Sequence, residues 1–206
     1  MANWITLSRI PLLILYIFMV YSENRVLLII AVPLLFAFIM MDTLDGWVAR
    51  SRGQASLIGS VLDIAADRMY ELVLWVIFSQ MALIPVAIPI IVIIRTTLTD
   101  ALRSIGVQQG LAPFKQHRSK LGSFLVGSPW MRASYSTFKI ISFCGLSLVV
   151  ALQSYPPGSA VLNASGIWLQ VFQITSWIAA AFCVVRGSPV VIGAIRRSLI
   201  RPQESS

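Results

Sequence analysis

Long apolar stretches separated by short polar segments dominate this sequence. Six stretches come close to the ~20 mostly apolar residues that a membrane-spanning helix needs. They cover residues 4–21, 26–41, 57–79, 83–102, 130–152 and 166–192. The second stretch becomes a full span only if its helix continues through residues 42–50. The pattern predicts an all-α integral membrane protein with six transmembrane helices.

The connections between these stretches contain the residues that end helices. Gly53 lies in a short basic turn, Pro156-Pro157-Gly158 lies in an uncharged loop, and residues 106–129 form a longer polar segment with several Gly and Pro residues. Residues 196–206 are polar. We therefore expect one six-helix domain over residues 1–195, followed by a polar tail.

Composition agrees with a membrane protein. Of the 206 residues, 57% are hydrophobic and 12% are charged, whereas a soluble domain carries about 25% charge. The net charge of +8 comes from residues beside the apolar stretches, which indicates membrane topology and anionic lipid rather than nucleic acid.

No signal-peptide pattern precedes the first stretch, so we expect it to be a transmembrane helix. Cys144 and Cys183 lie in apolar runs without metal or disulfide spacing, which favours a packing role.

The distribution of Lys and Arg predicts the orientation. If the N-terminus lies in the cytoplasm, nine basic residues of the connections and tail lie inside and only Arg25 lies outside. The nine are Arg50, Arg52, Arg103, Lys115, Arg118, Lys120, Arg196, Arg197 and Arg201. We therefore expect both termini, and the turn between the second and third helices, at the cytoplasmic face of the cell membrane.

Four of the eight acidic residues lie in or beside apolar helices: Asp42, Asp45, Asp63 and Asp67. Inserting one Asp at a helix centre costs about 2.5–3.5 kcal/mol, and four would repel each other unless cations lie among them. The first two are three residues apart and the last two are four apart, so each pair shares a helix face. A tight turn makes the two helices antiparallel neighbours, and the pairs can meet in one cleft. Such oxygen ligands suit Mg²⁺ or Mn²⁺ better than zinc.

Small residues accompany the carboxylates. Gly46, Ala49 and Gly59 leave the helix surfaces bare. This pattern allows close helix packing, and it also allows a nucleotide to lie against the backbone. Arg50 is suited to binding a pyrophosphate, and we favour the second interpretation.

Together these positions match D-x2-D-G-x2-A-R-x8-G-x3-D-x3-D from Asp42 to Asp67. This motif resembles the signature of the CDP-alcohol phosphotransferase (CDP-alcohol phosphatidyltransferase) family. The six apolar stretches and the Asn3-x2-Thr6-x2-Arg9 opening extend the resemblance over most of the chain. It implies a homodimeric membrane enzyme of phospholipid biosynthesis, which transfers a phosphatidyl group from CDP-diacylglycerol to a small alcohol and releases CMP.

The resemblance also implies roles for the motif residues. Two divalent ions, Mg²⁺ or Mn²⁺, would bind between the second and third helices near the cytoplasmic face. Asp67 would be the general base as well as a ligand. The metal ligands would be Asp42, Asp45, Asp63 and Asp67, and the CDP-lipid would contact Asp45, Gly46, Ala49, Arg50 and Gly59.

The acceptor site is expected among basic residues at membrane depth, because such residues usually serve a function and a phosphorylated acceptor needs about two or three cations. The candidates are Arg95, Arg118, Arg132 and Lys139. For Arg68 and Arg186, a functional role and simple extension toward the membrane interface both stay open.

Within the family, the chain most resembles bacterial phosphatidylglycerophosphate synthases, which implies glycerol 3-phosphate as the acceptor. It departs from them at Thr96, where they usually carry an acidic residue, and it lacks their Gly-Lys-x-Lys-Thr segment before the fifth helix. Inositol phosphate or phosphatidylglycerol therefore stays open as the acceptor. A cation transporter with an acidic site and an inactive scaffold of the same fold are the other readings of the aspartates.

Overall fold

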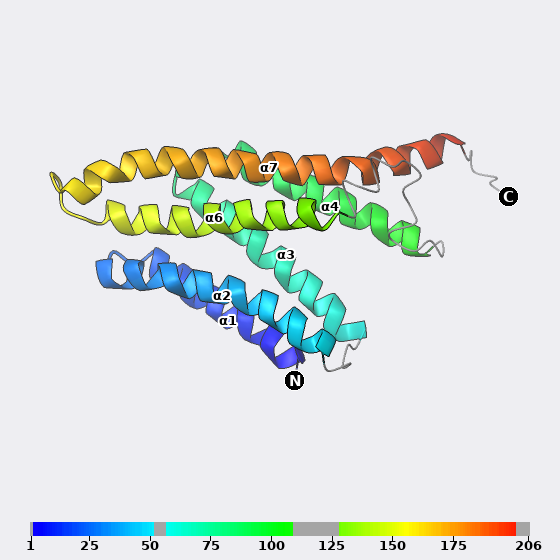
Figure 1. The fold of residues 1–206 in the computed structure, drawn as a ribbon, viewed down its shortest axis with the longest axis horizontal. Helices are drawn as coiled ribbons and strands as arrows, with labels where there is room; N and C mark the ends of the chain where they lie inside the picture. Colours follow the sequence, from blue (N-terminus) through cyan, green and yellow to red (C-terminus); the bar gives the residue numbers. More distant parts are fainter. Residues whose placement is uncertain (1, 52–56, 109–127, 201–206) are drawn as a thin grey trace. The chain divides into compact units, whose positions relative to one another are not determined.

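The computed structural model describes the backbone of residues 2–51, 57–108 and 128–200, and the side chains of residues 9–41, 64–102, 128 and 130–195. Within these residues the fold is entirely helical and contains no strand. The helices are α1 (Ala2–Val20), α2 (Arg25–Ser51), α3 (Leu57–Gln80), α4 (Ala87–Gln108), α6 (Pro129–Gln153) and α7 (Ala160–Ile200) (Figure 1). The all-α prediction is confirmed.

The boundaries of three helices differ from the apolar stretches by four residues or more. α2 continues through residues 42–51, as a full span of this stretch requires. α4 begins at Ala87, four residues later than predicted, and ends at Gln108, six residues later than predicted. α7 covers 41 residues and is longer at both ends than its predicted stretch. Its apolar part already begins at Ala160, and its last turns continue into the polar residues from Arg196.

The late start of α4 has a local cause in the turn after α3. The Leu83 amide donates to the carbonyl of Phe78 at 3.0 Å and the Ala82 amide donates to Ser79 at 3.0 Å, which together form a Schellman end to the helix. Ala82 takes the left-handed conformation there, with φ of 57°. Glycine is the usual residue at this position, so the sequence carries no clear signal for the turn.

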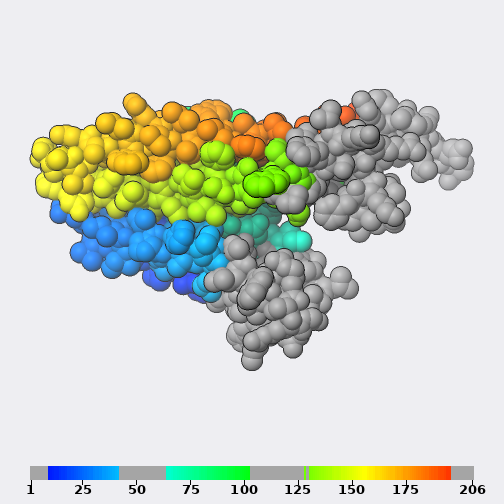
Figure 2. All heavy atoms as spheres, viewed as in Figure 1, coloured from blue at the N-terminus to red at the C-terminus, as the bar shows by residue number. Residues whose placement is uncertain are grey.

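Compact packing divides the chain into two units, each described here by itself. The first contains residues Met1–Ile84 and Ile140–Ile174, and the second contains Pro85–Lys139 and Thr175–Ser206. In the first unit, α1 packs against both α2 and α3. Figure 2 shows the side chains of α1 and α2, in blue, as one continuous block.

The core of the first unit is aromatic. Trp75 and Phe78 of α3 are fully buried, and each packs against Phe143 of α6, with ring centroids 4.6 and 6.1 Å apart. Gly145, half a turn further along α6, lies directly against the ring of Phe172 in α7, where a side chain on the glycine would collide with the ring. These contacts hold α3, α6 and α7 together within this unit.

Three connections meet at one end of the first unit. The hydroxyl of Tyr21, after α1, donates to Oε1 of Gln80, at the end of α3, at 2.6 Å. Arg25 donates from Nε to the carbonyl of Ser154, after α6, at 3.3 Å, and its guanidinium lies 4.7 Å from the ring centre of Tyr155. The ends of α1, α3 and α6 therefore lie together, as the predicted alternation of helix directions requires.

Two of the helices are long and apolar enough to cross a membrane within the part of the chain whose side chains are described. These are Trp130–Gln153 and Ala160–Ile195, while the apolar segments Arg9–Val20 and Arg25–Met41 are shorter. Large apolar side chains are exposed, among them Phe18 (68% exposed) and Ile167 (69%). A hydrocarbon surrounding would suit such side chains better than water.

Candidate active site

The four aspartates of the motif lie on two consecutive helices of the first unit. Asp42 and Asp45 belong to α2, and Asp63 and Asp67 belong to α3. The spacings of three and four residues therefore occur in helical backbone, and each pair shares a helix face. Asp67 is half-buried. The side chains of the other three lie outside the described residues.

An aromatic pair shows how α2 and α3 face each other beside these positions. Phe38 of α2 and Tyr70 of α3 are buried at 4% and 3% exposure, and their rings pack edge to face with centroids 5.3 Å apart and planes at 86°. The two side chains therefore mark the faces through which the helices touch.

The aspartate positions continue these same faces. Asp42 and Asp45 follow Phe38 by four and seven residues, and Asp67 and Asp63 precede Tyr70 by three and seven. At 100° per residue, all four lie within about 60° of the aromatic contact around their helix axes. In two helices of opposite direction, the pairs lie on the same side of the contact, toward the end of α2 and the start of α3.

This arrangement fits the donor set of a divalent metal site. Four carboxylates on facing helices provide the hard oxygen ligands that Mg²⁺ and Mn²⁺ prefer. Among the described side chains, no three His, Cys, Asp or Glu residues gather as a metal site, but three of the four aspartate side chains lie outside that set. The support for a metal site therefore comes from Asp67 and from the backbone positions of the other three aspartates in α2 and α3.

Glu71 is a buried acidic residue that the sequence reasoning missed. It lies one turn after Asp67, so it continues the line of Asp63 and Asp67 along α3. Its side chain is 1% exposed, and Oε2 lies 3.7 Å from Nη1 of Arg68. A buried carboxylate needs a partner of this kind. The contact gives Arg68 a definite role inside the protein, where the sequence left membrane-interface extension open.

The proposed CDP-lipid positions occupy the same stretch of the two helices. Gly46, Ala49 and Arg50 lie in the last turns of α2, and Gly59 lies in the first turn of α3. Their side chains lie outside the described residues. The backbone places all of them between the aspartates and the connection from α2 to α3.

The candidate acceptor residues differ in their surroundings. Lys139 is buried at 6% exposure, Arg95 is half-buried, and Arg132 is exposed. Arg118 lies outside the described residues. Lys139 lies beside Arg186, the other cation whose role the sequence left open, because both contact the ring of Tyr135.

Thr96 is also buried, at 3% exposure, and its hydroxyl has no hydrogen-bond partner among the described residues. A neutral side chain therefore follows Arg95 directly along α4.

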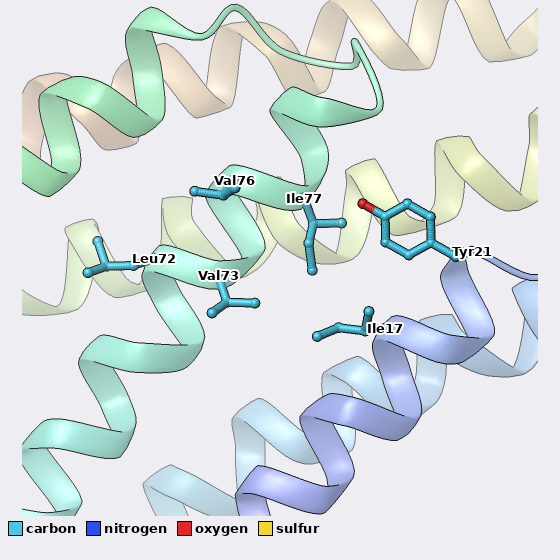
Figure 3. A pocket seen from close by; sticks show the side chains of 6 residues that line it. All are labelled: Ile17, Tyr21, Leu72, Val73, Val76 and Ile77. Atoms are coloured by element: carbon cyan, nitrogen blue, oxygen red, sulfur yellow. The ribbon is translucent and has the colours of Figure 1, made fainter.

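A pocket of about 350 Å³ lies between α1 and α3, away from the aspartates. Figure 3 shows Ile17 of α1 and Tyr21, directly after α1, facing Val73 and Ile77 of α3. Its lining is almost wholly apolar. Since it offers no charged group for a pyrophosphate or a metal ion, the pocket is not the candidate site.

Comparison with known protein families identifies the family. The model of the CDP-alcohol phosphatidyltransferase family matches residues 1–185. This range includes the whole aspartate motif and, apart from Arg186 itself, every candidate site residue named above. A comparison with curated protein sequences found no match.

Proposed function

The chain belongs to the CDP-alcohol phosphatidyltransferase family, and from this premise we propose that it transfers a phosphatidyl group from CDP-diacylglycerol to glycerol 3-phosphate in phospholipid biosynthesis. Membership makes it a phosphotransferase that acts on a CDP-alcohol and an alcohol acceptor. The particular lipid donor, the acceptor and the residue roles are the proposal. One observation above all supports this proposal: the aspartate positions of α2 and α3 lie on the helix faces that meet at the Phe38–Tyr70 contact.

We assign the metal site to Asp42, Asp45, Asp63 and Asp67. The family generally depends on divalent metal ions, and two Mg²⁺ or Mn²⁺ ions would neutralise the pyrophosphate and make the acceptor hydroxyl more acidic. The glycines and Ala49 leave room for the nucleotide against the helix backbone. Arg50 would hold a phosphate oxygen through its guanidinium.

Asp67 acts as the general base in this proposal. Its carboxylate accepts the proton of the acceptor hydroxyl, while the hydroxyl oxygen forms a bond to the lipid-side phosphorus. The bond from that phosphorus to the CMP oxygen breaks, and CMP leaves. Positioning of the two substrates and neutralisation of charge provide most of the rate in such a transfer.

We place the protein in the cell membrane with six spans, both termini in the cytoplasm and the aspartates near the cytoplasmic face. The joined ends of α1, α3 and α6 support this topology, because these three ends are predicted to share the outer face. Residues 1–195 form one catalytic domain in this proposal, followed by the tail 196–206, and the functional unit is a homodimer.

A cysteine-labelling experiment tests the orientation. In a variant in which Cys144 and Cys183 are replaced by Ser, Glu23→Cys and Pro157→Cys should react in intact cells with a membrane-impermeant maleimide. Ser205→Cys should react only after permeabilisation. Labelling of Ser205→Cys in intact cells would overturn the orientation.

An acceptor panel tests the reaction. Purified protein is supplied with CDP-diacylglycerol, Mn²⁺ and one of five acceptors: glycerol 3-phosphate, inositol 1-phosphate, serine, choline or phosphatidylglycerol. We expect CMP release, and a lipid product, with glycerol 3-phosphate. Inositol phosphate is the second candidate, because the neutral Thr96 departs from the subfamily that uses glycerol 3-phosphate. CMP release with choline or serine alone would refute a phosphorylated acceptor.

A cation transporter is the runner-up from another class. Membership of a transferase family makes a transporter function less favoured than transfer. The same preparation, reconstituted in liposomes, separates the two. Metal-ion flux without CMP release for any acceptor would refute the transferase and support the transporter.

A further inference from the structure

Three cations of the second unit gather around one aromatic ring and one glycine. We call this group the Tyr135 cluster, and it consists of Arg95 of α4, Tyr135 and Lys139 of α6, and Arg186 and Gly187 of α7. The sequence reasoning included Arg95 and Lys139 as separate candidates, left Arg186 undecided, and did not consider the tyrosine or the glycine.

The ring of Tyr135 holds two of the cations. Nζ of Lys139 lies 5.7 Å from the ring centre, and the guanidinium carbon of Arg186 lies 5.6 Å from it. Both distances fall within the range of about 6 Å over which an aromatic ring attracts a cation. Tyr135 is 5% exposed, so this attraction acts in a largely water-free surrounding, where it is stronger.

A second aromatic contact fixes α6 against α7 one turn away. Phe138 and Phe182 stack with centroids 5.6 Å apart and planes at 19°. Phe182 precedes Arg186 by four residues, so the two lie on the same face of α7. Tyr135 therefore meets Arg186 through a helix pairing that the stacked rings support independently.

Gly187 leaves space for the third cation, Arg95. A Cβ atom at this position would lie 2.5 Å from Nε and 2.9 Å from Cγ of Arg95. Nε of Arg95 is buried and has no hydrogen-bond partner among the described residues. Only glycine lets the Arg95 side chain lie in this position. Because Gly187 directly follows Arg186, the Arg95 side chain lies next to the position of Arg186 in α7.

α7 stays helical at this point in spite of a proline. Pro189 cannot donate the helical hydrogen bond to the carbonyl of Val185. The hydroxyl of Ser188 donates to that carbonyl instead, at 2.9 Å. The positions of Arg186 and Gly187 are thus supported by satisfied backbone rather than by a break in the helix.

The charge balance of these segments suits an anionic ligand. Residues 85–139 and 175–206 contain eleven of the sixteen Lys and Arg residues but only two of the eight acidic residues, Asp100 and Glu204. A phosphate ester with two negative charges requires about two or three cations for its oxygens, the number that the cluster gathers.

We propose that Tyr135 and Gly187 are positioning residues that hold Lys139, Arg186 and Arg95 for the phosphate group of the acceptor alcohol. The inference rests on the proposed function, since it assumes a phosphorylated acceptor. Tyr135 acts through the two cations on its ring, and Gly187 acts by leaving space for Arg95.

Enzyme kinetics on the full-length protein test this role. Tyr135→Leu removes the ring face, and we expect a rise of about tenfold in KM for glycerol 3-phosphate, with KM for CDP-diacylglycerol unchanged. Tyr135→Phe keeps the ring and should restore the acceptor KM. Gly187→Ala, which alters no charge, should also raise the acceptor KM selectively.

Two matched controls separate position from chemistry. Tyr155→Leu makes the same substitution at a ring that holds Arg25 at the other end of α6. Gly166→Ala makes the same substitution in α7 where nothing lies within 4 Å of the added atom. Both should leave the acceptor KM as in the wild type. An equal rise in both KM values for Tyr135→Leu, or an equal effect of Tyr135→Phe, would overturn the positioning role.

Thermal unfolding with glycerol 3-phosphate provides a readout that needs no turnover. The ligand should raise Tm of the wild type, by mass action on the folded state, and should do so less for Tyr135→Leu and Gly187→Ala. If the wild type shows this stabilisation but releases no CMP with glycerol 3-phosphate, the proposed acceptor fails and the cluster survives as a phosphate site. If glycerol 3-phosphate, inositol 1-phosphate and inorganic phosphate all fail to stabilise the wild type, the inference itself is wrong.

Discussion

Phe38 and Tyr70 pack edge to face across α2 and α3, with ring centroids 5.3 Å apart, one helical turn from the nearest motif aspartates. The contact is buried on both sides. It therefore sets the rotation of each helix about its own axis next to Asp42 and Asp67. A carboxylate pair on a helix serves a shared metal site only when that rotation is correct.

Weakening this aromatic pair should weaken metal binding. Phe38→Leu keeps an apolar side chain but removes the edge-to-face contact, which is worth about 0.5–1.5 kcal/mol. We expect the Mn²⁺ concentration for half-maximal CMP release to rise by about threefold to tenfold. Phe36→Leu is the control, because Phe36 lies in the same helix but is 50% exposed. Equal metal dependence in the two variants would contradict the role given to the pair.

Much of the fold follows from the sequence because each long apolar stretch is long enough to form one helix. Each apolar stretch corresponds to one of the helices in the described part of the chain. The start of α4 could not be predicted, since it depends on Ala82 in a conformation that favours glycine. The C-terminal end of α7 could not be predicted either, because Arg196 and Arg197 make it too polar to be recognised from hydropathy.

The two halves of the candidate site differ in how far the sequence predicts them. The aspartate motif has fixed spacings within two neighbouring helices, so local helical geometry is enough to place its residues on common faces. The Tyr135 cluster draws on α4, α6 and α7, and its members lie up to 92 positions apart, from Arg95 to Gly187. Contacts of that kind depend on tertiary packing, and neither the tyrosine nor the glycine differs in sequence from an ordinary packing residue.

The left-handed residue after α3 offers a test of stability. An alanine in this conformation costs about 1–2 kcal/mol relative to a residue without a Cβ atom, and part of this is offset by the greater freedom of glycine in the unfolded chain. Ala82→Gly should therefore raise Tm in detergent by about 1–3 °C. Ala87→Gly, at the start of α4, should not raise Tm. A lower Tm for Ala82→Gly would show that the Schellman turn does not form.

The close approach of Gly145 to Phe172 predicts the opposite effect of adding a methyl group. Gly145→Ala forces the buried Phe172 ring to move, and overpacking of this kind costs about 1–3 kcal/mol. Thermal unfolding in detergent should show a clear fall in Tm. Gly166→Ala is the matched control, because Gly166 lies in open space in α7 and alanine favours helix there. A Gly145→Ala protein as stable as Gly166→Ala would exclude the tight contact between α6 and α7.

Removing the charge of Asp67 should abolish most of the activity without unfolding the protein. Asp67→Asn keeps the size of the side chain but can no longer accept the acceptor's proton, and general-base catalysis contributes about 10²- to 10⁴-fold. We expect CMP release by Asp67→Asn to fall by at least that amount. Asp63→Asn should also lose activity, but high Mn²⁺ should restore part of it, because this variant loses a metal ligand and keeps the base. Glu23→Gln, an exposed acidic residue in the turn between α1 and α2, should keep wild-type activity. The half-buried Asp67 lies on the α3 face that Tyr70 marks. Full activity of Asp67→Asn would mean that this face serves only for packing. Another residue would then have to be the base.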